Sequence, residues 1–157
     1  MPITTESNVC RNFSIREFFP KHFYNKFKNQ SIKFIDPRIY VLADKIREYF
    51  DKTMTINDWA YGGKFNYRGF RPNQLLIESY TKNEKAFGSL TSQHAFGRAI
   101  DFHFDAIDTE EARQEIIRVR DEKFPEITAI EMDVNWIHVD VRANVNGELL
   151  TFYPSKF

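Results

Sequence analysis

The chain has 157 residues, of which 42% are hydrophobic and 28% charged, and its 22 basic residues equal its 22 acidic ones. This length and composition are typical of one globular domain, which we expect to span residues 1–157. The balanced charge argues against a nucleic-acid surface, and no segment approaches the ~20 apolar residues of a membrane span. We therefore expect neither a nucleic-acid partner nor a membrane span.

The N-terminal residues 1–6 carry neither the basic region nor the apolar run of a secretory signal. The single cysteine, Cys10, excludes an internal disulfide and is typical of a reducing compartment. We therefore expect synthesis in the cytoplasm without a signal peptide. The sequence indicates no oligomeric state.

Two helices and one strand are expected in the first half of the chain. Ser14 and Glu17 have the spacing of a capping box, which predicts a short helix beginning there. Asp36 and Pro37 place an N-cap before a proline at the first helical position. The apolar face of this second helix should comprise Ile39, Leu42, Ala43, Ile46 and Phe50. A strand should begin at residues 54–56. The stretch 62–90 is rich in glycine and proline, which predicts a long, irregular loop, and such loops are often functional.

Two segments of the second half alternate between apolar and polar residues, as half-buried strands do. These strands are expected at residues 99–105 and 136–142. A helix capped by Asp108 should lie between them, and Asn146-Gly147 predicts a hairpin into residues 149–153. Hairpins with segregated helices indicate an α+β fold, with a mainly antiparallel sheet and helices packed on one side.

Two of the four histidines lie in short segments that also carry carboxylates. If the alternating strands are neighbours, Asp101 and His138 project from the same face of the sheet. His94 lies just before the first of these strands, and Gly97 allows the chain to turn back so that the imidazole converges on them. Two imidazoles and one carboxylate with a fourth position open are typical of a catalytic zinc site. The alternative is a surface histidine at position 94 and a hydrogen-bonded sheet histidine at position 138.

The pattern S-x-H-x-x-G-x-A-x-D at residues 92–101, together with W-x-H-x-D at residues 136–140, resembles the signature segments of zinc D-Ala-D-Ala carboxypeptidases and dipeptidases. It equally resembles those of the phage L-alanyl-D-glutamate endolysins of the same group. Residues 13–18 and 68–72 also look like landmarks of the phage-type members. The resemblance implies the fold that these enzymes share with the hedgehog signalling domain, a hedgehog/DD-peptidase-like fold, and a bound zinc ion.

By this resemblance the zinc ligands are His94, Asp101 and His138. His103, on the same strand face as Asp101, is the one other residue that could bind the metal, and the simpler expectation is that it lines the cleft. Asp140 follows His138 by two residues, so it could orient that imidazole as a hydrogen-bond acceptor. It could equally pair with a nearby arginine.

Amide hydrolysis also needs a residue that takes a proton from water and passes it to the leaving amine. Many relatives carry an acidic residue three positions before the last histidine ligand, but here that position is Asn135, which cannot transfer a proton. Glu131 is our first choice for the role, because it lies on the preceding strand and has the longer reach. Asp133 is the alternative, although it could simply belong to a turn. If neither serves, the chain is a weak or inactive peptidase.

Four residues are expected to contact substrate. Arg71 is expected to hold a substrate carboxylate through paired hydrogen bonds, with Arg68 as runner-up, and both could instead be solvated loop charges. Ser92 could bind substrate or support His94. Trp136 could wall the cleft or pack beside the sheet.

These expectations combine into a predicted zinc-dependent peptidase that hydrolyses amide bonds of peptidoglycan stem peptides, of D-Ala-D-Ala or L-Ala-D-Glu type, with zinc-bound water as nucleophile. A phage or prophage protein acting on the bacterial cell wall would fit the missing signal. The first rival is a metal-binding peptide-capture module or virion structural component of the same fold. The second is an unrelated domain with structural histidines.

Overall fold

A computed structural model of the chain describes residues 9–72 and 92–154. Residues 73–91, which include much of the predicted irregular stretch, lie outside the described residues. The helices are α1 (Lys21–Phe27), α2 (Pro37–Phe50) and α3 (Thr109–Lys123). The strands are β1 (Met54–Thr55), β2 (Ala99–Phe104), β3 (Ala129–Glu131), β4 (Ile137–Asp140) and β5 (Leu150–Phe152). Within the described ranges, no helix is both long and apolar enough to cross a membrane.

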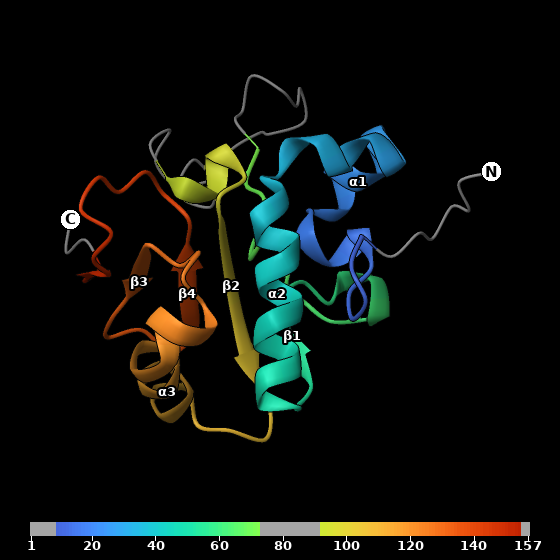
Figure 1. Ribbon diagram of the computed structural model, residues 1–157. Helices are drawn as coiled ribbons and strands as arrows, with labels where there is room; N and C mark the ends of the chain where they lie inside the picture. Colours follow the sequence, from blue (N-terminus) through green and yellow to red (C-terminus); the bar gives the residue numbers. More distant parts are fainter. Residues whose placement is uncertain (1–8, 73–91, 155–157) are drawn as a thin grey trace.

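The five strands form one mixed sheet in the order β1-β2-β4-β3-β5. Figure 1 shows β2 as the long central strand, with β1 on one side and β4 and β3 on the other. The pairings β1–β2, β2–β4 and β3–β4 are antiparallel, and β3–β5 is parallel. The predicted α+β class with a mainly antiparallel sheet is therefore confirmed.

The hairpin predicted at Asn146-Gly147 is wrong. Gly147 does adopt a left-handed backbone with φ of 70°. However, β4 already has β2 on one edge and β3 on the other, so β5 finds no free edge there. The chain instead passes to the far side of β3, where Thr128 accepts a hydrogen bond from the Leu150 N–H at 2.9 Å.

The local signals for helix starts are confirmed. The Asp36 carboxylate accepts a hydrogen bond from the Arg38 N–H at 3.0 Å and begins α2. The Asp108 carboxylate does the same for the Glu111 N–H at 3.1 Å and begins α3. The segment after Ser14 forms a short 3₁₀ helix, Ile15–Phe18, rather than an α-helix.

One hydrophobic core joins the helices to the sheet. The apolar sheet residues in it include Ile100, Phe102, Ile137 and Val139, all completely buried. The buried apolar residues of α2 and α3 belong to the same core, so both helices pack on this face of the sheet. The opposite face carries the polar members of β2 and β4, because side chains alternate along each strand.

Candidate metal centre

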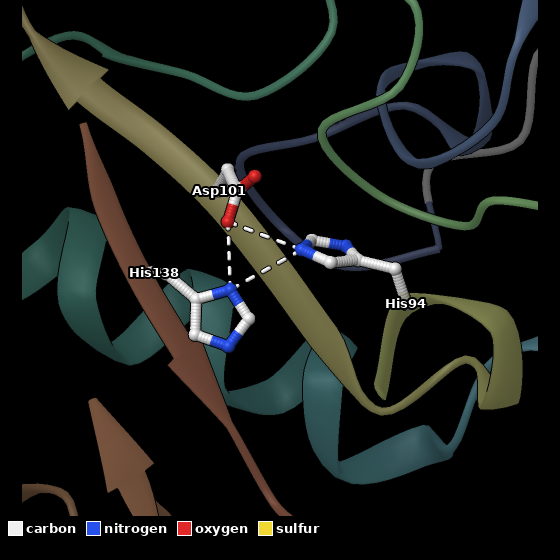
Figure 2. Close-up of side chains that lie close together, drawn as sticks. All are labelled: His94, Asp101 and His138. Carbon is white, nitrogen blue, oxygen red and sulfur yellow. Dashed lines mark hydrogen bonds and ion pairs between the residues drawn. The ribbon is translucent and has the colours of Figure 1, made fainter. Parts of the chain in front are cut away.

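Three side-chain atoms converge on the polar face of the sheet (Figure 2). His94 Nε2 lies 3.1 Å from Asp101 Oδ1 and 3.2 Å from His138 Nδ1. His138 Nδ1 lies 2.8 Å from the same Asp101 oxygen. All three residues are at most 5% exposed, so the three side chains form a buried group. The group could hold a metal ion.

The register of the sheet brings two of these residues together. Asp101 on β2 lies directly opposite His138 on β4, so the antiparallel pairing points both side chains to one face. His94 comes from a 3₁₀ turn, Gln93–Phe96, which ends at Gly97 with φ of 67°. A side chain at Gly97 would clash, because a Cβ there would lie 2.1 Å from the Phe34 carbonyl oxygen. Gly97 therefore turns the chain back toward the sheet, as predicted.

In each imidazole, the ring nitrogen that faces away from Asp101 Oδ1, here called the outer nitrogen, makes a hydrogen bond of its own. His94 Nδ1 lies 2.8 Å from the Gly69 carbonyl oxygen, which can only accept, so Nδ1 carries the proton. His138 Nε2 donates in the same way to Asp140 Oδ2 at 2.8 Å. The inner nitrogens of the neutral rings consequently direct lone pairs toward Asp101 Oδ1. Three lone pairs at such distances repel one another unless a proton or a metal cation lies between them.

The pKa values of the cluster follow from this arrangement. Burial lowers the pKa of His94. Burial also acts to lower the pKa of His138, but hydrogen bonds to Asp101 and Asp140 outweigh it and raise the value to about 9. Burial acts to raise the pKa of Asp101, but the two imidazoles hold it well below its usual range. In the metal-free chain, a proton on His138 thus supplies the positive charge that the cluster requires.

Two arginines hold the carboxylates of the centre. Arg71 Nη2 donates to Asp101 Oδ2 at 2.9 Å, and its Nε donates to the Tyr67 carbonyl at 2.7 Å. Arg142 donates to both oxygens of Asp140, through Nε at 2.8 Å and Nη2 at 2.5 Å. Asp140 therefore both orients His138 and pairs with an arginine. Sequence reasoning missed Arg142, although strand alternation places position 142 on the face of the two preceding polar residues.

A cavity of about 260 Å³ opens onto the three converging atoms. It is lined by Arg71, Ser92, Gln93, His94, Asp101, Glu131, Trp136, His138, Arg142 and Phe152. Ser92 accepts a hydrogen bond from the His94 N–H at 3.3 Å, so it supports the turn that carries this histidine. Glu131 lies in the cavity, and burial raises its pKa. Asp133 lies on an exposed turn with φ of 58° and does not line the cavity.

A second cavity of about 610 Å³ adjoins the first, and the two share Arg71, Asp101 and Trp136. Arg68 and His103 line this second cavity. Arg68 Nη1 lies 2.6 Å from His103 Nδ1, and His103 Nε2 lies 3.3 Å from Asp105 Oδ1. Both nitrogens of His103 are thus occupied away from the three converging atoms, and this histidine lines the cleft.

Comparison of the chain with models of protein families, with curated proteins and with solved structures gave no match.

Proposed function

We propose that the chain is a zinc-dependent peptidase acting on peptidoglycan stem peptides, at a bond of D-Ala-D-Ala or L-Ala-D-Glu type. The observation that carries this proposal is the convergence of His94 Nε2, Asp101 Oδ1 and His138 Nδ1 beside a cavity. The substrate class rests on the motifs at residues 92–101 and 136–140, which resemble those of zinc peptidases that act on such peptides.

The ligand set fits zinc. Ligands at ~2.0–2.1 Å from a tetrahedral zinc ion lie roughly 3.3 Å from one another. The three atoms here are 2.8–3.2 Å apart, so a slight expansion of the cluster would suffice. Both histidines also have the hydrogen bond on the outer nitrogen that metal-binding imidazoles almost always make, to Gly69 and to Asp140.

A zinc ion held here supplies Lewis-acid chemistry, by lowering the pKa of water to about 7 and polarising a carbonyl oxygen. Glu131 is the proton-transfer residue, because it is the carboxylate in the cavity that is not tied to a guanidinium or an imidazole by a hydrogen bond within the described residues. Burial raises the pKa of this carboxyl, which brings it closer to the range of an efficient general base. Arg71 fixes Asp101 from the opposite oxygen and so keeps Oδ1 facing the histidines.

The test is hydrolysis of a synthetic stem peptide by the zinc-loaded chain, beside Glu131→Gln and Asp133→Asn. We expect Glu131→Gln to lower kcat at least 100-fold at unchanged zinc content, since proton transfer contributes about 10²–10⁴-fold. Asp133→Asn, on its exposed turn, should keep near-native kcat. Absence of hydrolysis in a chain shown to hold one zinc ion would overturn the proposal.

One observation favours a second candidate, a metal-binding module that captures peptides without cleaving them. The position where many relatives carry an acidic residue is Asn135, which is exposed on the rim of the second cavity. Capture without turnover would appear as equal affinity for the peptide in the native chain and in Glu131→Gln, with no product from either.

A further inference from the structure

The second cavity, of about 610 Å³, is rich in aromatic and amide side chains. The rings of Phe65, Tyr67 and Trp136 line it, together with the amides of Asn66 and Asn135. Trp136 also lines the first cavity, so it stands where the two cavities meet. The chemistry proposed for the metal centre leaves this second cavity without an occupant.

The charged groups of the second cavity act mainly on one another. Arg71 Nη2 donates to Asp101 Oδ2 at 2.9 Å. The carboxylates of Asp101 and Asp58 both act on the charge of Arg68. Lys64 is exposed at the rim of the cavity. The interior therefore suits a neutral ligand that has an apolar face to set against the aromatic rings.

One wall of the cavity, formed by Asn135 and Trp136, is fixed by a buried arginine of α3. Arg113 is only 1% exposed, and its Nη2 donates to the Val134 carbonyl at 2.6 Å and to the Trp136 carbonyl at 2.5 Å. These two bonds lie on either side of Asn135, whose own side chain makes no hydrogen bond to another described residue. The backbone of the wall is thus held in place while the Asn135 amide is left for a ligand.

We propose that the second cavity binds an N-acetylated sugar ring of the glycan strand, recognised by Trp136 and Asn135. This inference rests on the proposed peptidase function and adds the glycan to the substrate of the same site. The C–H face of a sugar ring packs on an aromatic ring, and an acetamido group offers one donor and one acceptor to an asparagine amide. The sugar is neutral once its lactyl carboxyl is joined to the stem peptide, which matches the charges of the cavity.

A sugar in this cavity also selects one of the two bonds left open. The stem peptide is joined to the sugar through L-Ala, so the L-Ala–D-Glu bond lies one residue from the lactyl group. The D-Ala–D-Ala bond lies three residues further along, and each extended residue spans about 3.3–3.6 Å. The two cavities share Arg71, Asp101 and Trp136, so a sugar bound in the second lies beside the metal centre. The bond presented to the metal is then L-Ala–D-Glu.

The test compares three synthetic ligands for binding by calorimetry to the zinc-loaded Glu131→Gln chain. The first is N-acetylmuramyl-L-Ala-γ-D-Glu-L-Lys; the second has a lactoyl group in place of the sugar; the third extends the second with D-Ala-D-Ala. We expect the first to bind about 10- to 100-fold more tightly than the second, from ring stacking and a hydrogen bond to the acetamido group. The third should bind no more tightly than the second. Equal binding of all three, binding of none, or a gain only in the third, which assigns the cavity to a peptide, would overturn the proposal.

Variants of the same chain then locate the preference for the sugar. Asn135→Ala should reduce the preference about three- to tenfold, through loss of one hydrogen bond. Trp136→Leu should reduce it by a similar factor, about three- to tenfold, through loss of the stacked ring. Asp133→Asn, on the same loop but lining neither cavity, is the matched control and should keep the full preference. A preference that survives in both Asn135→Ala and Trp136→Leu would also overturn the proposal.

A change in the ligand separates the contact of Asn135 from a general disturbance of the loop. The first ligand with a hydroxyl group in place of its acetamido group should bind about three- to tenfold more weakly to the Glu131→Gln chain. The same change should cost nothing further in Asn135→Ala, because the partner of the acetamido group is already absent. Losses that simply add would contradict the assigned contact.

The proposed peptidase function is judged by other readouts. Zinc content and hydrolysis by the native chain test that function, whereas the sugar site is read from binding to a chain that does not turn over. A native chain that cleaves the muramyl and lactoyl peptides equally well, with equal affinity for both, would keep the function and lose the sugar site. A chain that prefers the muramyl peptide without cleaving it would keep the sugar site and lose the function.

Discussion

Both faces of the central sheet carry buried side chains, but the two faces are stabilised in different ways. On one face, Phe102 and Val139 are completely buried against the helices. On the other face, Asp101 and His138 are each only 5% exposed, and Asp140 is completely buried. The first face requires only close packing. The second holds ionisable groups, whose burial is tolerated because each of them is paired.

The difference lies in what each face still lacks. The apolar face is complete in the folded chain, since its side chains contact one another and the helices. The polar face directs the inner nitrogens of His94 and His138 at a carboxylate oxygen, so it needs a positive charge among these atoms, from a proton on His138 or from a bound metal ion. Substitutions on the two faces should therefore separate stability that depends on metal from stability that does not.

The largest effect is expected from removing a ligand. Asp101→Ala should abolish zinc binding, because it deletes the carboxylate shared by both imidazoles. With zinc at 100 times its Kd, the native chain should gain about 2.7 kcal/mol in unfolding free energy, and the variant should gain none. Zinc content by plasma mass spectrometry and urea unfolding provide the two measurements. His103→Ala is the matched control and should keep its zinc; a loss in that variant would contradict the ligand set.

Truncating a buried side chain on the apolar face should give the opposite result, a loss of stability that does not depend on zinc. Phe102→Ala truncates a fully buried ring, and such changes cost about 3–5 kcal/mol through lost burial and the cavity left behind. The loss should be the same with zinc and with a chelator, because the ring faces away from the metal centre. Urea unfolding in both conditions measures it. A loss that appears only with zinc present would show that the two faces are coupled.

Weaker effects should come from the residues that hold the ligands. Arg142→Leu leaves Asp140 without its two guanidinium bonds, and Asp140→Asn weakens the acceptor of the His138 N–H. Both should lower zinc affinity by about 10- to 100-fold, as substitutions behind metal ligands typically do. Competition with a chromogenic chelator gives the affinity. Arg142→Lys should recover part of the loss, and Arg118→Leu should cause none.

Much of this division between faces could be predicted from the sequence. Alternation along residues 99–105 and 136–142 assigned Asp101 and His138 to one face and the apolar residues to the other, because side chains on a strand alternate strictly. The helix caps at Asp36 and Asp108 were also predictable, since capping is a local interaction.

Long-range features could not be predicted in this way. The partner of β5 depends on which sheet edge remains free, which no local turn signal at Asn146-Gly147 reveals. The pairing of Arg71 with Asp101 depends on how the loop before it is anchored. At Gly69, a Cβ would lie 2.2 Å from the Phe18 carbonyl oxygen, and the Phe70 N–H donates to that same oxygen at 2.8 Å. Those contacts set the loop against the site, where Arg71, the arginine expected to bind substrate, donates to Asp101 instead.

The smallest effect is expected from a partly buried ionisable group outside the sheet, Glu17, in the short 3₁₀ helix Ile15–Phe18. Burial raises its pKa to about 7, and the Ser14 N–H, which donates to its carboxylate at 2.8 Å, lowers the pKa only in part. Because the folded pKa lies above the unfolded value of about 4.5, the folded chain retains a proton that the unfolded chain releases. Stability should therefore be full below pH 4.5 and fall as pH rises through 7, by about 1–2 kcal/mol once solvent screening of the partly exposed group is included. Glu17→Gln, neutral at every pH, should match the native chain near pH 5 and exceed it in urea unfolding at pH 8. Identical pH profiles for the two chains would mean that the carboxylate at position 17 does not require a proton to be buried, in contrast to the cluster on the polar face.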